Sequence, residues 1–314
     1  MEDLKQYQPG ANKLIHHLDH LKLIKEGRVC GAIHLSFWPN ANCNLNCSYC
    51  CGRNVMDRSK EINFQEYDDM LEVLIEKGLM ALEFSGIIGE PTLWTHFDDG
   101  VRLAWERGVS LSLITNGTTL KNIPDSTLKM FKWIRISIQS PQHFESIDFG
   151  RLKELTRVST SYMLAEGEED VNKKLYNMYK KIEDKGIIMR VAVARPCSYV
   201  FENHIRHGVH SLGEPMFFSE KPSGKALGCY MAWVRGAVDW NGYFYPCPAI
   251  QLNPEYNGFI PEKFKLCHIS NLEEWLDKNP PKDLGHKCTF CNCGKENNDL
   301  IHTLLKGVED VDFV

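Results

Sequence analysis

The sequence has no long hydrophobic run and no strong excess of charge of either sign. No stretch of about 18 apolar residues occurs, which argues against a membrane-spanning helix. The N-terminus MEDLKQYQPGANK is acidic and polar, where a secretory signal would be basic and then apolar. The net charge of -5 argues against a broad basic surface for duplex nucleic acid. We therefore expect a cytoplasmic protein with no membrane partner, and individual nucleotides or other small polar molecules stay open as substrates.

The chain is too long to need disulfides in place of a hydrophobic core, yet it contains twelve cysteines. Its 314 residues, 43% of them hydrophobic, suffice for an ordinary core. In a reducing compartment, clustered cysteines are more often metal ligands or catalytic groups than a disulfide framework. Four of them lie close together and predict such a site: Cys43, Cys47, Cys50 and Cys51.

Apolar runs alternate with amphipathic stretches from residue 32 to residue 195. This alternation predicts βα units around a parallel sheet, an α/β fold. The first cysteine cluster follows the first expected strand, at the end where parallel α/β folds build their active sites. Helices are expected near 142–156 and over 168–186. The six expected strands lie at 32–38, 81–86, 109–117, 133–140, 157–164 and 187–195.

The pattern changes after Pro196, where Gly, Pro and aromatic residues replace the βα alternation. We therefore expect a helical segment over 1–30, a barrel-like part over 31–196, and a linker with a small C-terminal module over 197–314. NKLIHHLDHLKLIKEG, near the N-terminus, reads as a single helix. In the C-terminal module, two strands around the turn DWNG predict a hairpin, followed by helices at NLEEWLDK and KENNDLIHTLLKG.

Cys43, Cys47 and Cys50 form a C-x3-C-x2-C motif that supplies three thiolates from one loop. A structural zinc site needs a fourth ligand, and an adjacent residue such as Cys51 rarely points at the same metal. Three thiolates leave one iron of a [4Fe-4S] cluster open to another molecule. With Tyr49 before the last cysteine, the motif resembles that of the radical S-adenosylmethionine (radical SAM) superfamily.

The resemblance implies a partial (β/α)6 TIM-like barrel in which the three cysteines hold a [4Fe-4S] cluster that binds S-adenosylmethionine, with Tyr49 against the adenine. FSGIIGEPTLW resembles the family's Gly-Gly-Glu segment, where Gly89 and Glu90 match and Ile88 replaces the first glycine. Each candidate also has a structural interpretation, as a capping acid, a turn, a strand-end residue or a surface ion pair. The further cofactor contacts implied are Asn116, Ser137, Gln139 and Arg195.

A second cysteine group lies in the C-terminal module. The spacing C-x12-G-x4-C, followed by a C-x2-C pair, is compatible with a zinc ribbon. It also resembles the twitch module, a shortened SPASM extension of radical SAM enzymes, which implies one auxiliary [4Fe-4S] cluster. Cys293 is an alternative to Cys291, whereas Cys267 is expected to be a structural thiol. The implied ligands are Cys229, Cys247, Cys288 and Cys291.

Cys197 directly follows the sixth expected strand and is a candidate hydrogen-atom donor, with a buried structural thiol as the alternative. The resemblance implies an oxidoreductase or isomerase that takes an electron from a flavodoxin- or ferredoxin-type donor. It would cleave S-adenosylmethionine to a 5'-deoxyadenosyl radical, which takes a hydrogen atom from a small polar substrate, a sugar, an aminocyclitol or a nucleotide-linked metabolite, for oxidation or rearrangement. Three alternatives stay open: radical modification of a peptide, isomerisation of a modified nucleobase, and a zinc-stabilised binding module.

Overall fold

The computed structural model describes residues 11–50, 57–86, 88–194, 197–219, 224–252, 262–285, 288, 291 and 294–307. The chain forms two compact units, each assembled from separate stretches of sequence. The first unit comprises Met1–Trp38, Ile62–Leu82 and Lys221–Val314, and the second comprises Pro39–Glu61 and Glu83–Glu220. These units differ from the expected division into 1–30, 31–196 and 197–314, which follows motifs rather than contacts. Within the described part of the chain, no helix combines the length and the apolar character needed to cross a membrane.

The second unit is built on a parallel sheet whose strands pair in chain order from β5 to β9. In the strand RVSTSYML, the alternate residues Val158, Thr160, Tyr162 and Leu164 are all buried, which is the pattern of a sheet face covered by helices. The strands are β5 (Ser110–Thr115), β6 (Phe131–Ile138), β7 (Arg157–Leu164), β8 (Ile188–Val193) and β9 (Met216–Phe218).

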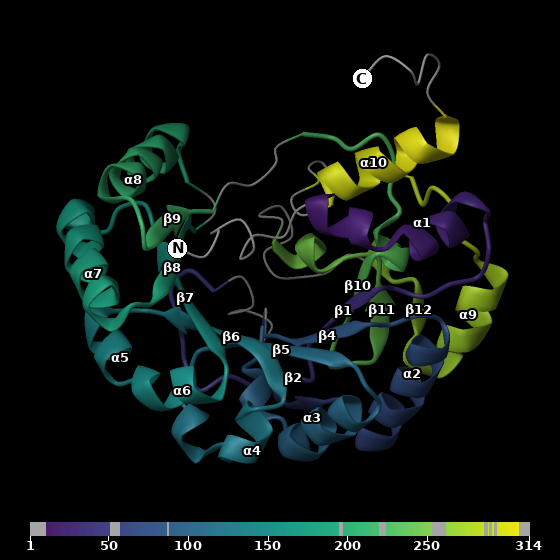
Figure 1. Cartoon of the computed structure of the whole chain (residues 1–314), viewed down its shortest axis with the longest axis horizontal. Coiled ribbons are helices and arrows are strands. Elements are labelled where there is room, and N and C mark those ends of the chain that lie inside the picture. Colours follow the sequence, from purple (N-terminus) through teal and green to yellow (C-terminus); the bar gives the residue numbers. More distant parts are fainter. Residues whose placement is uncertain are drawn as a thin grey trace. The chain divides into compact units, whose positions relative to one another are not determined.

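Helices lie along one face of this sheet, on the outer side of its curve (Figure 1). Their buried residues are apolar at helical spacing, as in α7, where Leu175, Met178 and Ile182 face inward. The helices are α3 (Phe97–Glu106), α4 (Asp125–Leu128), α5 (Pro141–Glu145), α6 (Phe149–Leu155), α7 (Val171–Lys185) and α8 (Tyr199–Leu212).

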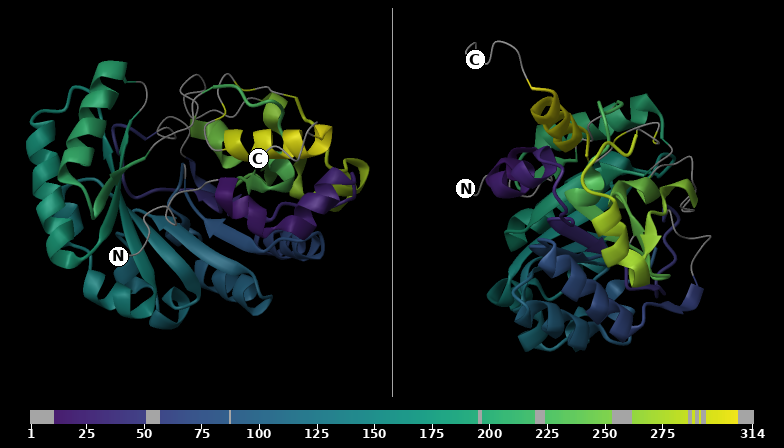
Figure 2. Two further views of the ribbon diagram at one scale, coloured as in Figure 1. Left: turned by 45° about the horizontal axis from the view of Figure 1, so that its top comes forward. Right: turned by 90° about the vertical axis from the view of Figure 1, so that its right-hand side faces the viewer.

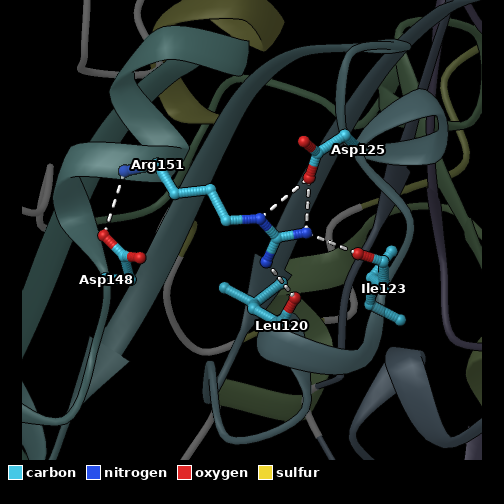
Figure 3. A network of polar contacts seen from close by, with 5 residues as sticks. All are labelled: Leu120, Ile123, Asp125, Asp148 and Arg151. Carbon is cyan, nitrogen blue, oxygen red and sulfur yellow. Dashed lines mark hydrogen bonds and ion pairs between the residues drawn. The ribbon is translucent and has the colours of Figure 1, made fainter.

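Arg151 ties α6 to the connection between β5 and β6 (Figure 3). Its guanidinium donates to the carbonyl oxygens of Leu120 and Ile123, at 3.0 and 2.7 Å. The Nε atom donates to the Asp125 carboxylate at 2.8 Å. The planar guanidinium can serve these acceptors together, which a lysine could not.

The prediction for residues 142–156 and the one for the segment after Pro196 were each wrong in part. The first segment forms two helices, α5 and α6, because Asp148 begins a new helix by capping the N–H of Arg151 at 3.0 Å. After Pro196 the βα alternation continues through α8 and β9, and β9 pairs in parallel with β8. Ser198 caps α8, so the histidines His204, His207 and His210 belong to a helix.

The first unit contains a strand pair from distant parts of the sequence and the predicted hairpin. Strand β1 (His34–Phe37) pairs in parallel with β10 (Arg235–Val238). β10 pairs antiparallel with β11 (Tyr243–Tyr245), and β11 with β12 (Cys267–His268). Gly242 has a φ of +73°, so the Asn-Gly turn is confirmed. The hairpin packs against α9, with ring centroids of Phe244 and Trp275 5.7 Å apart, and both elements are drawn in green to yellow-green in Figure 2.

The helices of the first unit match the sequence expectations except at the N-terminus. The predicted single helix is interrupted at His17, whose side chain accepts no capping hydrogen bond, and becomes a 3-10 segment followed by a short α-helix. The elements are η2 (Ala11–His16), α1 (Leu18–Lys25), α2 (Phe64–Glu76), η5 (Met231–Trp233), η6 (Pro248–Leu252), η8 (Glu262–Phe264), η9 (Ile269–Asn271), α9 (Leu272–Lys278) and α10 (Lys295–Lys306).

All six expected strands are present, as β1, β4 (Ala81–Phe84), β5, β6, β7 and β8. The predicted α/β class with a parallel sheet is therefore confirmed. A further small sheet, β2 (Asn40–Ala41) with β3 (Asp57–Glu61), was not predicted, because every residue of β3 is exposed and carries no apolar pattern. Short 3-10 segments η3 (Pro91–Leu93) and η4 (Leu120–Asn122) follow β4 and β5.

Candidate active site

The cysteine loop follows β2 in the second unit and carries Cys43, Cys47 and Cys50 at half-buried positions. The N–H of Cys50 donates to the carbonyl oxygen of Cys47 at 3.1 Å, which turns the loop back on itself. Burial raises the pKa of the Cys43 and Cys47 thiols, and the negative charge of a Cys50 thiolate raises both further. Three neighbouring thiols whose thiolates repel one another suit a cationic centre, so this donor set fits an iron-sulfur cluster.

The ten cysteines that the structure describes form no disulfide. Over the same described ranges, no three His, Cys, Asp or Glu side chains are grouped so as to hold a single metal ion. A cubane cluster has a different requirement, since it binds its thiolates through separate iron atoms.

The Gly89-Glu90 segment packs directly against the start of the cysteine loop. The Glu90 N–H donates to the Asn42 carbonyl at 2.7 Å, and the Asn40 amide donates to the Glu90 carbonyl at 2.9 Å. A Cβ on Gly89 would lie 2.2 Å from the Asn40 carbonyl oxygen, and one on Gly86 would lie 1.5 Å from the Gly89 carbonyl oxygen. Both glycines are therefore required by close backbone approach.

The Glu90 carboxylate lies at the centre of a buried polar network, with only 2% of the residue exposed. Its Oε1 atom accepts from the hydroxyls of Thr92 and Thr115 at 2.7 and 2.5 Å, and from the Thr92 N–H at 3.3 Å. Its Oε2 atom accepts from the Asn116 N–H at 2.7 Å. Burial raises the pKa of Glu90, while these four donors oppose the shift. The carboxylate thus joins the segment after β4 to the end of β5.

The Asn116 side chain continues this network into the cysteine loop. Its Nδ2 atom donates to the Asn44 side-chain oxygen at 2.9 Å and lies 3.8 Å from the Cys43 sulfur, within hydrogen-bond reach of a sulfur acceptor. Its side-chain oxygen accepts from the N–H and the hydroxyl of Thr118, at 3.0 and 2.6 Å. Asn116, which was predicted as a site residue, therefore contacts the cysteine loop directly.

Tyr49, Ser137 and Gln139 also lie in the second unit. Burial raises the pKa of the Tyr49 hydroxyl, the Cys47 thiolate charge raises it further, and the Gln139 side chain opposes the shift. The Ser161 hydroxyl donates a hydrogen bond to the Ser137 hydroxyl at 3.4 Å. Among the described residues, the Gln139 Oε1 atom is buried and accepts no hydrogen bond. A buried acceptor of this kind suits a ligand that brings a donor, such as a ribose hydroxyl.

Comparison with known proteins assigns this arrangement to a family. Residues 39–182 match the family model described as the radical SAM superfamily, and this range contains the cysteine loop, Glu90, Asn116 and Gln139. Residues 39–182, just under half of the chain, therefore form a radical SAM domain. Its cofactors are accordingly a [4Fe-4S] cluster and S-adenosylmethionine, which the three thiols and the buried Gln139 acceptor fit.

Two relatives of this chain act on nucleotides, according to their names. A probable GTP 3',8-cyclase from Pyrococcus abyssi is 28% identical over 134 residues, which make up 43% of this chain and 42% of the relative. An S-adenosylmethionine-dependent nucleotide dehydratase from Selenomonas ruminantium is 31% identical over 102 residues, 31% of this chain and 36% of the relative. The matches thus span less than half the length of either relative.

Among solved structures, the fold of this chain resembles that of SuiB of Streptococcus suis bound to the precursor peptide SuiA. The TM-score is 0.54 at 14% identity, and the similarity covers 96% of this chain and 70% of that one. At this level of identity, the similarity supports the partial-barrel fold alone.

In the C-terminal module, three of the four expected auxiliary ligands lie near one another. Burial, together with the smaller effect of the thiolate charges of Cys288 and Cys291, raises the pKa of Cys229 to about 11. Burial and then Cys291 likewise raise the pKa of Cys288. Cys247 lies two residues after β11 and is half-buried. The thiol chemistry fits a second iron-sulfur centre.

Asn298 of α10 bridges this thiol group, and the sequence analysis missed it. Its Nδ2 atom donates to the Cys291 sulfur at 3.6 Å, and its side-chain oxygen accepts from the Tyr230 N–H at 2.6 Å. Asn298 is only 1% exposed. Asp283 adds a second anchor, because its carboxylate accepts from the Cys229 N–H at 2.8 Å.

Four further cysteines and one arginine were singled out in the sequence. Arg195, Cys293 and Cys51 lie outside the described residues. Cys197 is half-buried in the loop between β8 and α8. On β12, Cys267 has its pKa raised to about 12 by burial, which is compatible with a structural thiol.

Proposed function

We propose that this chain uses the radical SAM cluster to abstract a hydrogen atom from a nucleotide-linked substrate. The observation that supports the substrate class is the match to two relatives named as nucleotide enzymes, a GTP 3',8-cyclase and a nucleotide dehydratase. The small polar substrate expected from the sequence includes this class. The names of these relatives also favour a redox-neutral rearrangement or elimination over net oxidation.

When bound, the cluster supplies the electron that cleaves S-adenosylmethionine, and the adenosyl fragment released then takes a hydrogen atom from the substrate. The residues of this chain hold and orient the reactants. Cys43, Cys47 and Cys50 would ligate the cluster. Glu90 and Gly89 would fix the segment proposed to meet the amino group of the cofactor, and Gln139 would accept a hydrogen bond from its ribose.

Asn116 and Ser137 would complete the cofactor contacts, and Cys229, Cys247, Cys288 and Cys291 would hold one auxiliary cluster. Cys197 is proposed as a hydrogen-atom donor to a substrate radical. Arg195 is proposed to pair with the cofactor carboxylate in the bidentate manner that Arg favours. A flavodoxin- or ferredoxin-type protein would deliver the electron.

The test is anaerobic reconstitution of the full chain with iron and sulfide, followed by incubation with S-adenosylmethionine, a reductant and one candidate substrate at a time. The panel contains nucleoside mono-, di- and triphosphates, nucleotide sugars, an aminocyclitol and a peptide. We expect a nucleotide to raise 5'-deoxyadenosine formation above the uncoupled rate. The product mass separates water loss, loss of two hydrogens and isomerisation. Stimulation by the peptide alone would reject the proposed substrate class.

A further inference from the structure

Three side chains at the edge of the active site form a closed ring of hydrogen bonds. Asn116 donates to the Asn44 side-chain oxygen at 2.9 Å, and Asn44 donates to the Thr118 hydroxyl at 2.7 Å. The Thr118 hydroxyl donates in turn to the Asn116 side-chain oxygen at 2.6 Å. Each member donates once and accepts once within the ring, so the orientation of each amide is defined by its partners.

The ring fixes where the Asn116 amide points. Because the side-chain oxygen accepts both the hydroxyl and the backbone N–H of Thr118, the Nδ2 atom faces the cysteine loop. There it lies 3.8 Å from the Cys43 sulfur. The Leu45 N–H approaches the same sulfur at 3.5 Å. Cys43 therefore receives two N–H donors, one of them from a side chain that three hydrogen bonds orient.

Asn116 also lies between the sulfur and a buried carboxylate. Its backbone N–H donates to Glu90 at 2.7 Å, and only 7% of Asn116 is exposed. A negative charge on the Glu90 carboxylate opposes further negative charge at Cys43, whereas the Asn116 amide N–H directed at the Cys43 sulfur favours it. The position of this amide thus determines how well the site tolerates an extra electron on the cluster.

We propose that Asn116, held in place by Asn44 and Thr118, is a positioning residue that raises the reduction potential of the cluster bound at Cys43. The inference rests on the proposed function, in which Cys43 ligates the radical SAM cluster. Hydrogen bonds to cluster sulfurs and other partners of the ligands set cluster potentials, since they stabilise the more negative reduced state.

The test compares Thr118→Val with Thr118→Ser. Thr118 does not contact sulfur; Val removes the hydroxyl that closes the ring, whereas Ser keeps it. Asn116→Ala removes the donor itself, and Asn46→Ala is the matched control, because Asn46 is an exposed asparagine of the same loop. Each variant of the full chain is reconstituted, its iron is counted, and the cluster whose EPR signal changes on adding S-adenosylmethionine is titrated with reductant.

We expect Thr118→Val and Asn116→Ala to lower the midpoint potential, with the larger shift for Asn116→Ala, while Thr118→Ser and Asn46→Ala keep the wild-type value. If Asn116→Ala loses its iron, the Thr118 pair decides the question. Equal potentials for Thr118→Val and Thr118→Ser would then overturn the inference. A wild-type protein with no EPR signal that responds to S-adenosylmethionine would reject the proposed function itself, a different result from unchanged potentials.

Discussion

Glu90 combines an expected position with a role that its sequence motif did not define. The motif implied a contact with the amino group of the cofactor, whereas the structure surrounds the carboxylate with four donors of the protein. These donors leave Oε2 with one protein partner, so a cofactor contact and a structural role are compatible. The residue holds together the turn after β4 and the end of β5.

Replacement of Glu90 by Ala is expected to lower the free energy of unfolding by roughly 3 kcal/mol, because it leaves buried donors without an acceptor. Glu90→Gln keeps one acceptor and should cost roughly 1 kcal/mol. Denaturant unfolding followed by circular dichroism measures both. Equal stability of the Ala variant and wild type would contradict the role of Glu90 as a hub.

The same carboxylate predicts a pH effect. Burial raises the pKa of Glu90 in the folded state, so the folded protein binds its proton more strongly than the unfolded chain does. The contribution of this group to stability is therefore largest at low pH and declines as pH rises from the unfolded pKa to the folded one. The stability difference between wild type and Glu90→Gln should shrink over that interval and then level off.

Other residues of the site could be anticipated only in part. Gly89, Glu90 and Asn116 stand in recognisable segments, but Asn40, Asn44 and Thr118 do not. The sequence does contain a signal, since asparagines occupy alternate positions around Cys43 in NANCN. Their partners come from the ends of other strands, and such pairing cannot be derived from local sequence.

At the scale of elements, long apolar runs were predicted correctly and short or polar elements were not. The six strands expected from the sequence are all present. In contrast, β9 has only three residues, and α8 contains Gly208 and three histidines that weaken its helical pattern. Every residue of β3 is exposed, so the strand has no apolar pattern that could predict it.

The α6 anchor provides an element-scale prediction. Arg151→Ala is expected to lower the free energy of unfolding by roughly 2 kcal/mol, because the Leu120 and Ile123 carbonyls each lose a charged donor. Arg151→Lys should restore less than half of this, since an ammonium cannot reproduce the planar fork. Asp125→Ala should cost less than Arg151→Ala, because an exposed ion pair contributes little. Chemical denaturation of the three variants checks the order.

Helix α10 provides a second prediction at the scale of elements. Asn298→Ala should reduce the iron held by the C-terminal module, because Asn298 links Cys291 to the segment that follows Cys229. Asn297→Ala, one position earlier on the same helix, is the matched control. Iron and sulfide assays after reconstitution measure the effect. Equal iron in both variants would remove the proposed role of Asn298 at the auxiliary site.

At the scale of the whole molecule, the two cysteine groups belong to different compact units. Cys43, Cys47 and Cys50 lie within Pro39–Glu61 of the second unit, whereas Cys229, Cys288 and Cys291 lie within Lys221–Val314 of the first. Each thiol group is arranged by partners from its own unit, such as Asn116 for Cys43 and Asn298 for Cys291.

Loss of one cluster should therefore leave the other in place. The wild-type chain should hold about eight irons, and the triple variant Cys43→Ala, Cys47→Ala, Cys50→Ala should keep roughly four and form no 5'-deoxyadenosine. The double variant Cys229→Ala, Cys288→Ala should also keep roughly four, and should still cleave S-adenosylmethionine without forming product if the auxiliary cluster accepts an electron.

Circular dichroism must accompany these assays, since metal-bound modules can require their metal to fold. A folded double variant that lacks the auxiliary iron yet forms product would assign that cluster a structural role. Loss of all iron in either variant would show that the two sites do not form independently.

The pairing of β1 with β10 has a consequence for synthesis of the chain on the ribosome. His34 pairs with Arg235, so β1 is made long before its parallel partner exists. The second unit is complete in sequence once Glu220 has been translated, whereas the first unit begins earlier and still awaits Lys221–Val314. The ribosome therefore starts the first unit before the second but completes the second unit before the first. During that interval the apolar strand HLSF has no β10 to pair with, which makes it a natural contact for chaperones that bind emerging chains.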